Sequence, residues 1–246
     1  LSGIPLRTKD RKKGDTLVIG GGPCSYNPEP IADFFDIFYM GEGEVSYDEL
    51  LELYKVYKHS DMTRQEFLIK VSNIPGLYVP ELYEVTYHED GTIASFGPKF
   101  DGVPATVTKT VVMDHSKVTY PEKPVVSFMK LTQDRVVLEI MRGCIRGCRF
   151  CQAGMIYRPT RPKNVDMLKG YAEKMLASTG HEEITFSSLS SSDYEDLPEL
   201  TDCLIEKMDN EHVNISLPSL RIDAFSLDVM SKIQDVKKSS LTFAPE

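Results

Sequence analysis

Three cysteines lie within eight positions of this 246-residue sequence, in the segment RGCIRGCRFCQAG that runs from Arg142 to Gly154. They are Cys144, Cys148 and Cys151, and the chain has only two other cysteines. Cysteine thiolates at such short spacings are typical ligands of iron–sulfur clusters. Three local thiolates leave the fourth iron of a four-iron cluster open, unless a distant cysteine supplies the last ligand. The segment therefore predicts an iron–sulfur site with one open coordination position.

The neighbourhood of these cysteines is basic and rich in glycine. The sequence from 142 to 163 has no acidic residue and six basic ones: Arg142, Arg146, Arg149, Arg158, Arg161 and Lys163. Nearby positive charge lowers the pKa of a thiol and offsets the negative charge of a cluster. Gly143, Gly147 and Gly154 would let the backbone wrap closely around a compact inorganic core. We therefore expect a tight loop with a cationic surrounding.

A zinc knuckle is the main alternative for three clustered cysteines. A closed zinc site needs four ligands, which usually come as two pairs. Neither Cys24 nor Cys203 belongs to a second pair, and no histidine follows the cluster within reach in the sequence. The sequence favours an iron–sulfur cluster over zinc, and it assigns Cys24 to a buried or surface thiol and Cys203 to a helix core.

Composition excludes several other classes of protein. The net charge is −9 and the hydrophobic fraction is 41%, which is ordinary for a globular protein. No apolar run reaches the ~18–20 residues of a membrane helix, and the basic, polar start does not resemble a signal peptide. Clustered cysteines in an odd number indicate a reducing cytoplasm rather than a disulfide framework. An acidic total disfavours broad nucleic-acid binding but leaves room for a local basic site.

The second half of the sequence alternates between strands and helices. Strands are expected at 135–141, 182–189, 213–220 and 239–246, and helices at 164–180, 196–209 and 226–234. Asn164 and Ser226 are the expected N-caps, and Gly180 follows the first helix. Such alternation implies parallel pairing with right-handed crossovers. Without a glycine-rich nucleotide fingerprint, these steps predict part of a β/α barrel, whose active-site residues follow the strands. The three cysteines follow the first strand.

The first half has a different organisation. Strands are expected at 15–23 and 34–40, each followed by glycines, and a helix at 45–58. Thr63 and Glu66 form a capping-box pattern that predicts a second helix. Asp90 and Gly91 suit the turn of a hairpin. The segment from 98 to 134 reads as an extended connector between two units.

The cysteine segment resembles the signature of the radical S-adenosylmethionine (SAM) enzymes, Cys-x3-Cys-x-aromatic-Cys, with Phe150 in the aromatic position. The resemblance implies a full or partial β/α barrel and a [4Fe-4S] cluster bound by Cys144, Cys148 and Cys151. SAM would chelate the open iron through its amino and carboxylate groups. One electron from the cluster would cleave the sulfonium bond, and the resulting 5′-deoxyadenosyl radical would abstract hydrogen from an unknown substrate. An electron donor such as flavodoxin or ferredoxin is the implied partner.

The same resemblance suggests contacts to SAM. Phe150 would lie near the adenine, unless it is an ordinary core aromatic residue. After the second strand, where the family often has a Gly-Gly-Glu-like stretch for the SAM amino group, this chain has SSLSSSD. Ser188 and Ser190 are the candidates there, through hydroxyls or nearby carbonyls. The alternative is a helix-capping loop in which Asp193 caps the next helix.

Two further strand ends carry candidate SAM contacts. Ser219 and Arg221 follow the third strand, and arginine suits a carboxylate in bidentate fashion. The alternative for Arg221 is a surface ion pair. Glu246 ends the fourth strand, where the family often places a polar residue on the ribose hydroxyls. The alternative for Glu246 is a chain-end glutamate in solvent.

A second resemblance covers about residues 15–56. The stretch VIGGGP, with GEGE after the next strand, is similar to the end of the cobalamin-binding-type domain that precedes the barrel in many radical SAM proteins. The Asp-x-His-x-x-Gly signature that supplies a histidine to cobalt is absent, and DHSK at Asp114 has the wrong spacing. Cobalamin is therefore a doubtful cofactor.

Together the two resemblances identify a B12-binding-domain-type radical SAM protein, and we expect the chain to be a fragment of it. The expected organisation is the end of a Rossmann-like cobalamin-binding-type α/β domain at 1–60, then a helix, hairpin and extended linker at 61–134. The first half of a radical SAM β/α barrel follows at 135–246. Two other functions stay open: an RNA-modifying methyl- or methylthio-transferase type of radical SAM enzyme, and a non-catalytic iron–sulfur electron carrier. Nucleic acid is the less favoured partner, and no membrane partner is expected.

Overall fold

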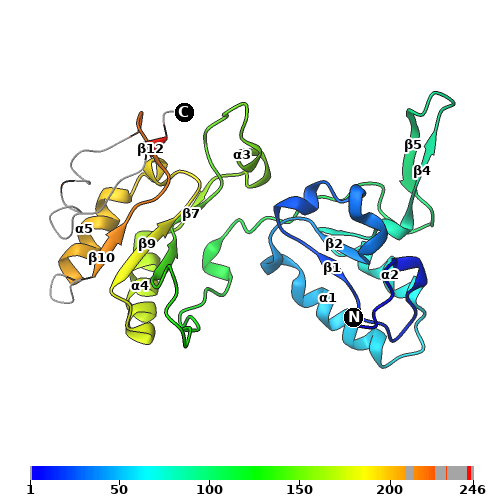
Figure 1. The fold of residues 1–246 in the computed structure, drawn as a ribbon, viewed down its shortest axis with the longest axis horizontal. Helices are drawn as coiled ribbons and strands as arrows, with labels where there is room; N and C mark the ends of the chain where they lie inside the picture. Colours follow the sequence, from blue (N-terminus) through cyan, green and yellow to red (C-terminus); the bar gives the residue numbers. More distant parts are fainter. Residues whose placement is uncertain (1, 209–212, 225–230, 232–242, 245–246) are drawn as a thin grey trace. The chain divides into compact units, whose positions relative to one another are not determined.

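The computed structural model describes residues 2–208, 213–224, 231 and 243–244, and the chain divides into two compact units, Leu1–Thr119 and Tyr120–Glu246 (Figure 1). The helix expected at 226–234 lies outside the described residues apart from position 231, and Glu246 also lies outside them. No helix within the described ranges is long and apolar enough to cross a bilayer. The fold is mixed α/β.

The first unit is built on a small mixed sheet. Strand β1 (Ile19–Gly20) pairs in parallel with β2 (Ile37–Tyr39), and β2 pairs antiparallel with β3 (Leu77–Tyr78). Helices α1 (Tyr47–Lys58) and α2 (Arg64–Ser72) share a buried apolar cluster with this sheet. The predicted capping box starts α2, because Thr63 Oγ1 accepts from the backbone N–H of Glu66 at 3.2 Å and Glu66 Oε2 accepts from that of Thr63 at 2.8 Å.

A fully buried carboxylate ties this unit together. Asp36 precedes β2 and has 0% of its side chain exposed. Arg11 Nη1 lies 2.6 Å from its Oδ2, Arg64 Nη2 lies 2.5 Å from its Oδ1, and the backbone N–H of Val18 donates to Oδ2 at 2.7 Å. Asp36 therefore joins the N-terminal segment, the parallel strands and α2.

The predicted hairpin and connector are both present. Strands β4 (Tyr83–Tyr87) and β5 (Ile93–Pro98) pair antiparallel around Asp90 and Gly91, and Gly91 has a φ of +82°. Residues 99–135 contain no named strand or α-helix, although Thr110 bridges to Gly41 in parallel. Short 3-10 helices complete the described chain: η1 (Thr8–Asp10), η2 (Pro23–Tyr26), η3 (Glu29–Phe34), η4 (Gly43–Val45), η5 (Pro80–Leu82), η6 (His115–Lys117) and η7 (Ser191–Asp193).

The second unit contains the predicted parallel sheet. Its order is β10 (Asn214–Ser216), β9 (Glu183–Ser187) and β6 (Val136–Glu139), so consecutive strands of the β/α series are neighbours. Two short ladders accompany this sheet: β7 (Met141–Arg142) pairs antiparallel with β8 (Arg161–Pro162), and β11 (Leu220–Arg221) pairs in parallel with β12 (Phe243–Ala244). Figure 1 shows β9 and β10 side by side near α4 and α5.

Three helices have their bounds within the described residues of this unit: α3 (Gln152–Ile156), α4 (Val165–Thr179) and α5 (Leu197–Met208). Asn164 Oδ1 caps α4 by accepting from the backbone N–H of Asp166 at 2.8 Å, and Gly180 ends it in the left-handed conformation at φ +70°. Both caps were predicted. Leucines of α4 and α5 share one buried cluster with Leu138, Ile184 and Phe186 of the sheet. This packing fixes the strands, and the loops after them form one edge.

Candidate functional site

The cysteine loop is closed at its base by a carboxylate. Glu139, the last residue of β6, accepts from Lys163 Nζ at 2.6 Å and from Arg142 Nε at 3.0 Å. Lys163 has 3% of its side chain exposed, and its Nζ lies 4.2 Å from the ring centroid of Tyr120. Burial alone would raise the pKa of Glu139, but the contacts with Lys163 and Arg142 outweigh burial and hold this pKa below its usual value. One side chain thus ties both ends of the segment 142–163, alongside the β7–β8 ladder.

At only one of the three glycines in the loop does the neighbouring backbone come too close for a larger residue. Gly143 has a φ of +82°, and a Cβ placed there would lie 2.5 Å from the carbonyl oxygen of Pro159. At Gly147 and Gly154 the nearest atoms would be 3.9 Å and 3.7 Å away, which are ordinary contacts. The expectation that all three glycines let the backbone wrap closely therefore holds at Gly143, where the two sides of the loop touch.

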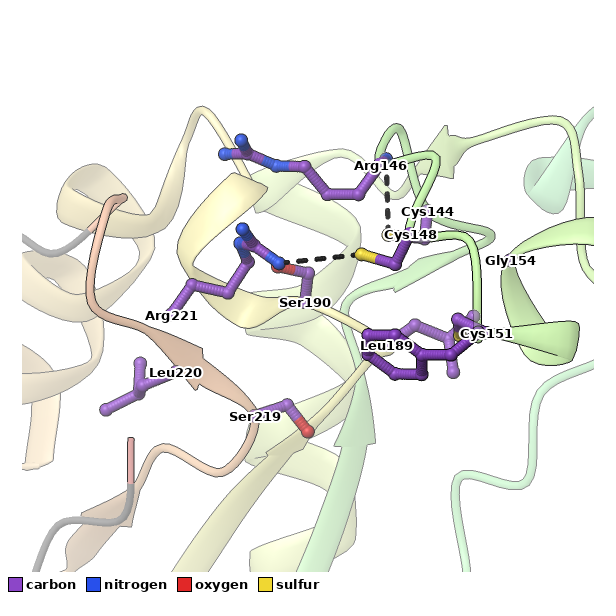
Figure 2. A pocket seen from close by; sticks show the side chains of 11 residues that line it. Cys144, Arg146, Cys148, Cys151, Gly154, Leu189, Ser190, Ser219, Leu220 and Arg221 are labelled. Carbon is purple, nitrogen blue, oxygen red and sulfur yellow. Dashed lines mark hydrogen bonds between the residues drawn. The ribbon is translucent and has the colours of Figure 1, made fainter. Parts of the chain in front are cut away.

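A cavity of about 310 Å³ lies beside the loop (Figure 2). Seven predicted site residues line it: Cys144, Cys148, Cys151, Phe150, Ser190, Ser219 and Arg221. Among the described residues, Arg146, Gly154, Leu189 and Leu220 also line it, and none of these was assigned to the site from the sequence. The walls come from the cysteine loop, from the segment after β9 and from the segment around β11. The cavity therefore lies at the carboxyl ends of parallel strands, where α/β folds place their sites.

One predicted residue that the structure describes, Ser188, is not among those that line the cavity. Ser188 contacts Ser191 through their hydroxyls, with the two Oγ atoms 2.9 Å apart. Glu246 lies outside the described residues. Asp193, considered as a helix cap, instead accepts from Ser190 Oγ at 2.7 Å and from Arg146, and α5 begins at Leu197. The serine-rich segment therefore contributes Ser190 to the cavity and Asp193 to a polar network.

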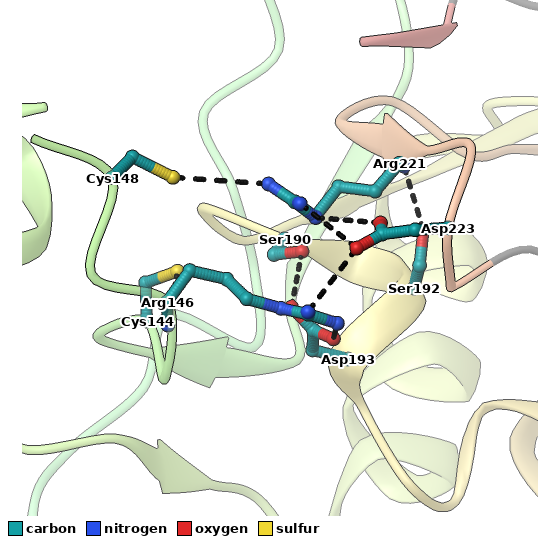
Figure 3. Close-up of polar contacts among 8 residues, drawn as sticks. All are labelled: Cys144, Arg146, Cys148, Ser190, Ser192, Asp193, Arg221 and Asp223. Atoms are coloured by element: carbon teal, nitrogen blue, oxygen red, sulfur yellow. Dashed lines mark hydrogen bonds and ion pairs between the residues drawn. The ribbon is translucent and has the colours of Figure 1, made fainter. Parts of the chain in front are cut away.

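That network contains two arginines and two aspartates (Figure 3). Arg146 Nε donates to Asp193 Oδ2 at 2.9 Å, and Arg146 Nη1 lies 3.3 Å from Asp223 Oδ2. Arg221 donates through Nε and Nη2 to the two oxygens of Asp223, at 2.9 Å and 3.0 Å. Hydrogen bonds from Arg146 and Arg221 lower the pKa values of Asp193 and Asp223 respectively, and the same bonds raise the pKa values of both arginines. All four groups are charged at neutral pH, and their charges sum to zero.

The fold adds acidic side chains, which the local sequence lacks, to the basic surroundings of the cysteines, and they balance part of the positive charge. Arg142 and Lys163 contact Glu139, and Arg146 contacts Asp193 and Asp223, which lie 47 and 77 positions away in the sequence. Arg158 also donates to the backbone carbonyl of Arg146, and Arg161 donates to those of Tyr157 and Pro159. Position at a strand end is the signal that could have singled out Asp193 and Asp223.

Ser219 adds a backbone feature to the cavity. It is a non-glycine residue with a φ of +60°, in the sparsely populated left-handed region. Its carbonyl accepts from the backbone N–H of Ser191 at 3.2 Å, which links the segments after β9 and β10. Strained backbone that persists beside a cavity is typical of ligand-binding positions.

The arrangement of ligating side chains distinguishes between kinds of metal centre. Within the described residues, no three His, Cys, Asp or Glu side chains converge closely enough to hold a single metal ion. A tetrahedral zinc needs its sulfurs at about 2.3 Å from one ion, whereas an iron–sulfur cluster offers each thiolate its own iron. All three cysteines line one cavity, as a cluster that gives each thiolate its own iron requires.

The sequence matches two families of known proteins. Residues 1–80 match the family described as radical SAM proteins, N-terminal, and residues 138–246 match the radical SAM superfamily. An uncharacterised protein of Methanocaldococcus jannaschii is 31% identical over 241 residues, which are 97% of this chain and 45% of that protein. The chain thus spans less than half the length of this relative.

A solved structure gives a more distant likeness. The radical SAM methyltransferase TsrM from Kitasatospora setae, solved with cobalamin and a [4Fe-4S] cluster bound, matches with a TM-score of 0.45 and 13% identity. The match covers 90% of this chain and 40% of TsrM, and it is too distant for the ligands of TsrM to be transferred. The two family matches decide the assignment: the chain belongs to the radical SAM superfamily, whose members use a [4Fe-4S] cluster and S-adenosylmethionine.

Proposed function

We propose that this chain carries the cofactor-binding part of a radical SAM enzyme, in which Cys144, Cys148 and Cys151 bind a [4Fe-4S] cluster and SAM takes the open iron. The observation that carries the proposal is that all three cysteines line a single cavity at the ends of parallel strands. When bound, the cluster and SAM supply a 5′-deoxyadenosyl radical that abstracts hydrogen from a substrate. The residues of the chain bind, orient and shield these groups.

The cavity walls suggest a role for each candidate residue. Phe150 is 76% exposed although it lines the cavity, which supports stacking on a flat ligand rather than a place in the core. Ser190 and Ser219 bring hydroxyl and carbonyl groups suited to the amino group of SAM. Arg221 suits a carboxylate, but its Nε and Nη2 already hold Asp223. A bidentate grip by Arg221 on the SAM carboxylate would therefore have to displace Asp223.

The finer fold assignment is part of the same proposal. We assign the second unit to a partial β/α barrel, since β6, β9 and β10 follow chain order without the reversal typical of doubly wound sheets. We assign the first unit to the end of a Rossmann-like domain, on the parallel pair β1–β2 and the glycines after each strand. Cobalamin has little support: His115, the histidine of DHSK, is buried and is not in the cobalt-binding signature.

An RNA substrate has less support than a small molecule or a protein. Phosphate binding needs basic side chains that are available to the nucleic acid. The basic segment is largely occupied within the fold, where its side chains contact Glu139, Asp193, Asp223 and backbone carbonyls. As partners we propose a small one-electron donor of the flavodoxin or ferredoxin type and a substrate that reaches the strand ends.

The test is anaerobic reconstitution of the full-length protein with iron and sulfide, followed by EPR spectroscopy with and without SAM. We expect about four irons per chain, a reduced-cluster spectrum that changes when SAM is added, and 5′-deoxyadenosine after reduction. Alanine at Cys144, Cys148 or Cys151 should abolish these signals. The same change at Cys24 or Cys203 should leave them intact, because neither residue lines the cavity.

Three results would overturn the proposal. A spectrum that is indifferent to SAM, with no 5′-deoxyadenosine, would indicate an electron carrier. Stoichiometric zinc without iron would indicate a zinc knuckle. If alanine at one of the three cysteines leaves iron binding intact, that cysteine is not a ligand and the cluster lies elsewhere.

A further inference from the structure

We propose that Arg146, Asp193, Arg221 and Asp223, here called the arginine–aspartate network, position the cysteine loop against the exits of β9 and β11. This inference rests on the proposed function only for the role of the loop, which is to bind the cluster. Arg146 is the residue through which the network acts on the loop, and Asp193 and Asp223 are its anchors. The two aspartates are positioning residues, which lie outside the cysteine motif.

Arg146 is fixed to the loop by its backbone and to the β9 exit by its side chain. It lies between Cys144 and Cys148 in the sequence, and its carbonyl oxygen accepts from Arg158 Nη2 at 3.1 Å. Its guanidinium engages both carboxylate oxygens of Asp193, a side-on geometry that restricts orientation as well as distance. Movement of the loop away from β9 would break both hydrogen bonds together.

The burial of Asp193 makes this contact costly to lose. The Asp193 side chain is 5% exposed, and a buried carboxylate without its charged partner is strongly unfavourable. By contrast, the ion pair between Lys174 and Glu122 has both side chains more than 40% exposed, and pairs of that kind contribute little. Arg146 and Asp193 therefore constrain the loop in a way that a surface ion pair cannot.

Asp223 extends the constraint to the β11 exit. It is within ion-pair distance of Arg146 and also holds Arg221 with two hydrogen bonds. Arg221 is fixed in turn by its backbone N–H, which donates to Ser192 Oγ at 3.0 Å, and its Nη1 lies 3.8 Å from Cys148 Sγ. Figure 3 shows this continuous path from Asp193 through Arg146, Asp223 and Arg221 to the cysteine.

The experiment measures the loop in the reduced, metal-free full-length protein, so that it does not depend on cofactor binding. Each cysteine is alkylated with iodoacetamide over a range of pH, and the limiting rate of its thiolate is followed by peptide mass spectrometry, because nearby charge alters the fraction of thiolate. In Asp193→Asn and in Arg146→Gln, we expect Cys144 and Cys148 to react about fivefold faster than in the wild type. The double variant should react no faster than either single variant, because both changes remove one interaction.

A matched control removes an ion pair from the other end of the same strands. Arg135 Nη1 lies 2.7 Å from Glu183 Oε1, just before β6 and at the first residue of β9. Arg135→Gln should leave the alkylation rates of Cys144 and Cys148 unchanged, even if the melting temperature falls. Where a single variant does not fold, the exchanged pair Arg146→Asp with Asp193→Arg should fold and lower the rates again.

The outcomes separate this inference from the proposed function. Unchanged cysteine rates in folded Asp193→Asn, or additive effects in the double variant, would overturn the positioning role. Faster rates in Arg135→Gln would also overturn it, because they would reveal a general loosening of the unit. Accelerated alkylation in a protein that never takes up iron would support the network while refuting the enzyme. Unchanged alkylation in a protein that takes up iron, responds to SAM and forms 5′-deoxyadenosine would do the reverse.

Discussion

Arg221 directs its Nη1 toward the sulfur of Cys148 at 3.8 Å while Asp223 holds the other edge of the same guanidinium (Figure 3). A hydrogen-bond donor or positive charge beside a ligating sulfur stabilises the more negative, reduced form of a cluster. Because Asp223 engages Nε and Nη2, the guanidinium cannot turn freely away from the sulfur. At the proposed cluster, Arg221 would therefore act on the sulfur of Cys148 without having to bind the SAM carboxylate.

This contact predicts a change in redox potential. Replacing Arg221 by methionine removes the donor and one positive charge and leaves Asp223 with Arg146 as its charged partner, so the midpoint potential should become more negative by on the order of tens of millivolts. The measurement is a redox titration of the reconstituted cluster followed by EPR. Arg135→Gln is the control and should keep the wild-type potential. An unchanged potential in Arg221→Met would show that the contact does not persist in the loaded protein.

The close approach at Gly143 predicts a sharp difference between two glycines of one loop. Gly143→Ala would place a Cβ 2.5 Å from a backbone oxygen at a φ of +82°, which costs about 1–3 kcal/mol in strain before any clash is relieved. We expect loss of iron binding and a lower melting temperature. Gly147→Ala, whose nearest neighbour would be 3.9 Å away, should retain iron. Equal behaviour of the two variants would contradict the loop geometry.

The sequence indicated the fold wherever the signal was local. The capping box at Thr63 and Glu66, the Asn164 cap and the turn at Asp90 and Gly91 all depend on residues within a few positions of each other. Apolar strands in alternation with helices gave the parallel sheet, and the position of Cys144 after the first strand gave the edge of that sheet. These features need no knowledge of distant contacts.

The charge balance of the site could not be predicted in that way. Glu139, Asp193 and Asp223 meet the basic segment only after the sheet has formed, so the local sequence does not show which of its charges are balanced. The serine-rich segment posed a similar difficulty. Ser188 and Ser190 are two positions apart, yet the first bonds to Ser191 and the second lines the cavity. After the end of a strand, the turns of the backbone determine which side chains face the cavity. The alternation of a regular strand does not continue into such turns.

The buried carboxylate of the first unit gives a stability prediction. Asp36→Ala leaves Arg11, with 4% of its side chain exposed, without its charged partner, which should destabilise the unit by about 3 kcal/mol or more. Glu81→Ala removes the other, 37%-exposed partner of Arg64 and should cost less than about 1 kcal/mol. Hydrogen exchange of the peptides around β2 in denaturant measures both values for this unit alone. Similar losses in the two variants would show that Asp36 is not the organising charge.

Glu139 predicts a specific dependence of stability on pH. Since its pKa is lower in the folded protein than its ordinary value near 4.5, its charge stabilises the second unit above that value, and the contribution is lost as the pH falls through the folded pKa. Stability should therefore decline below about pH 4.5.

The variant Glu139→Gln tests this dependence. It should lower the free energy of unfolding by about 2 kcal/mol at pH 7, because it leaves Lys163 buried without its carboxylate. It should also make stability depend less on pH in the acid range. Urea unfolding between about pH 3 and pH 7 measures both effects. Glu122→Gln, which removes an exposed carboxylate beside Lys174, should keep the wild-type acid limb. A Glu139→Gln curve parallel to that of the wild type would mean that the ends of the cysteine loop are held by the β7–β8 ladder alone.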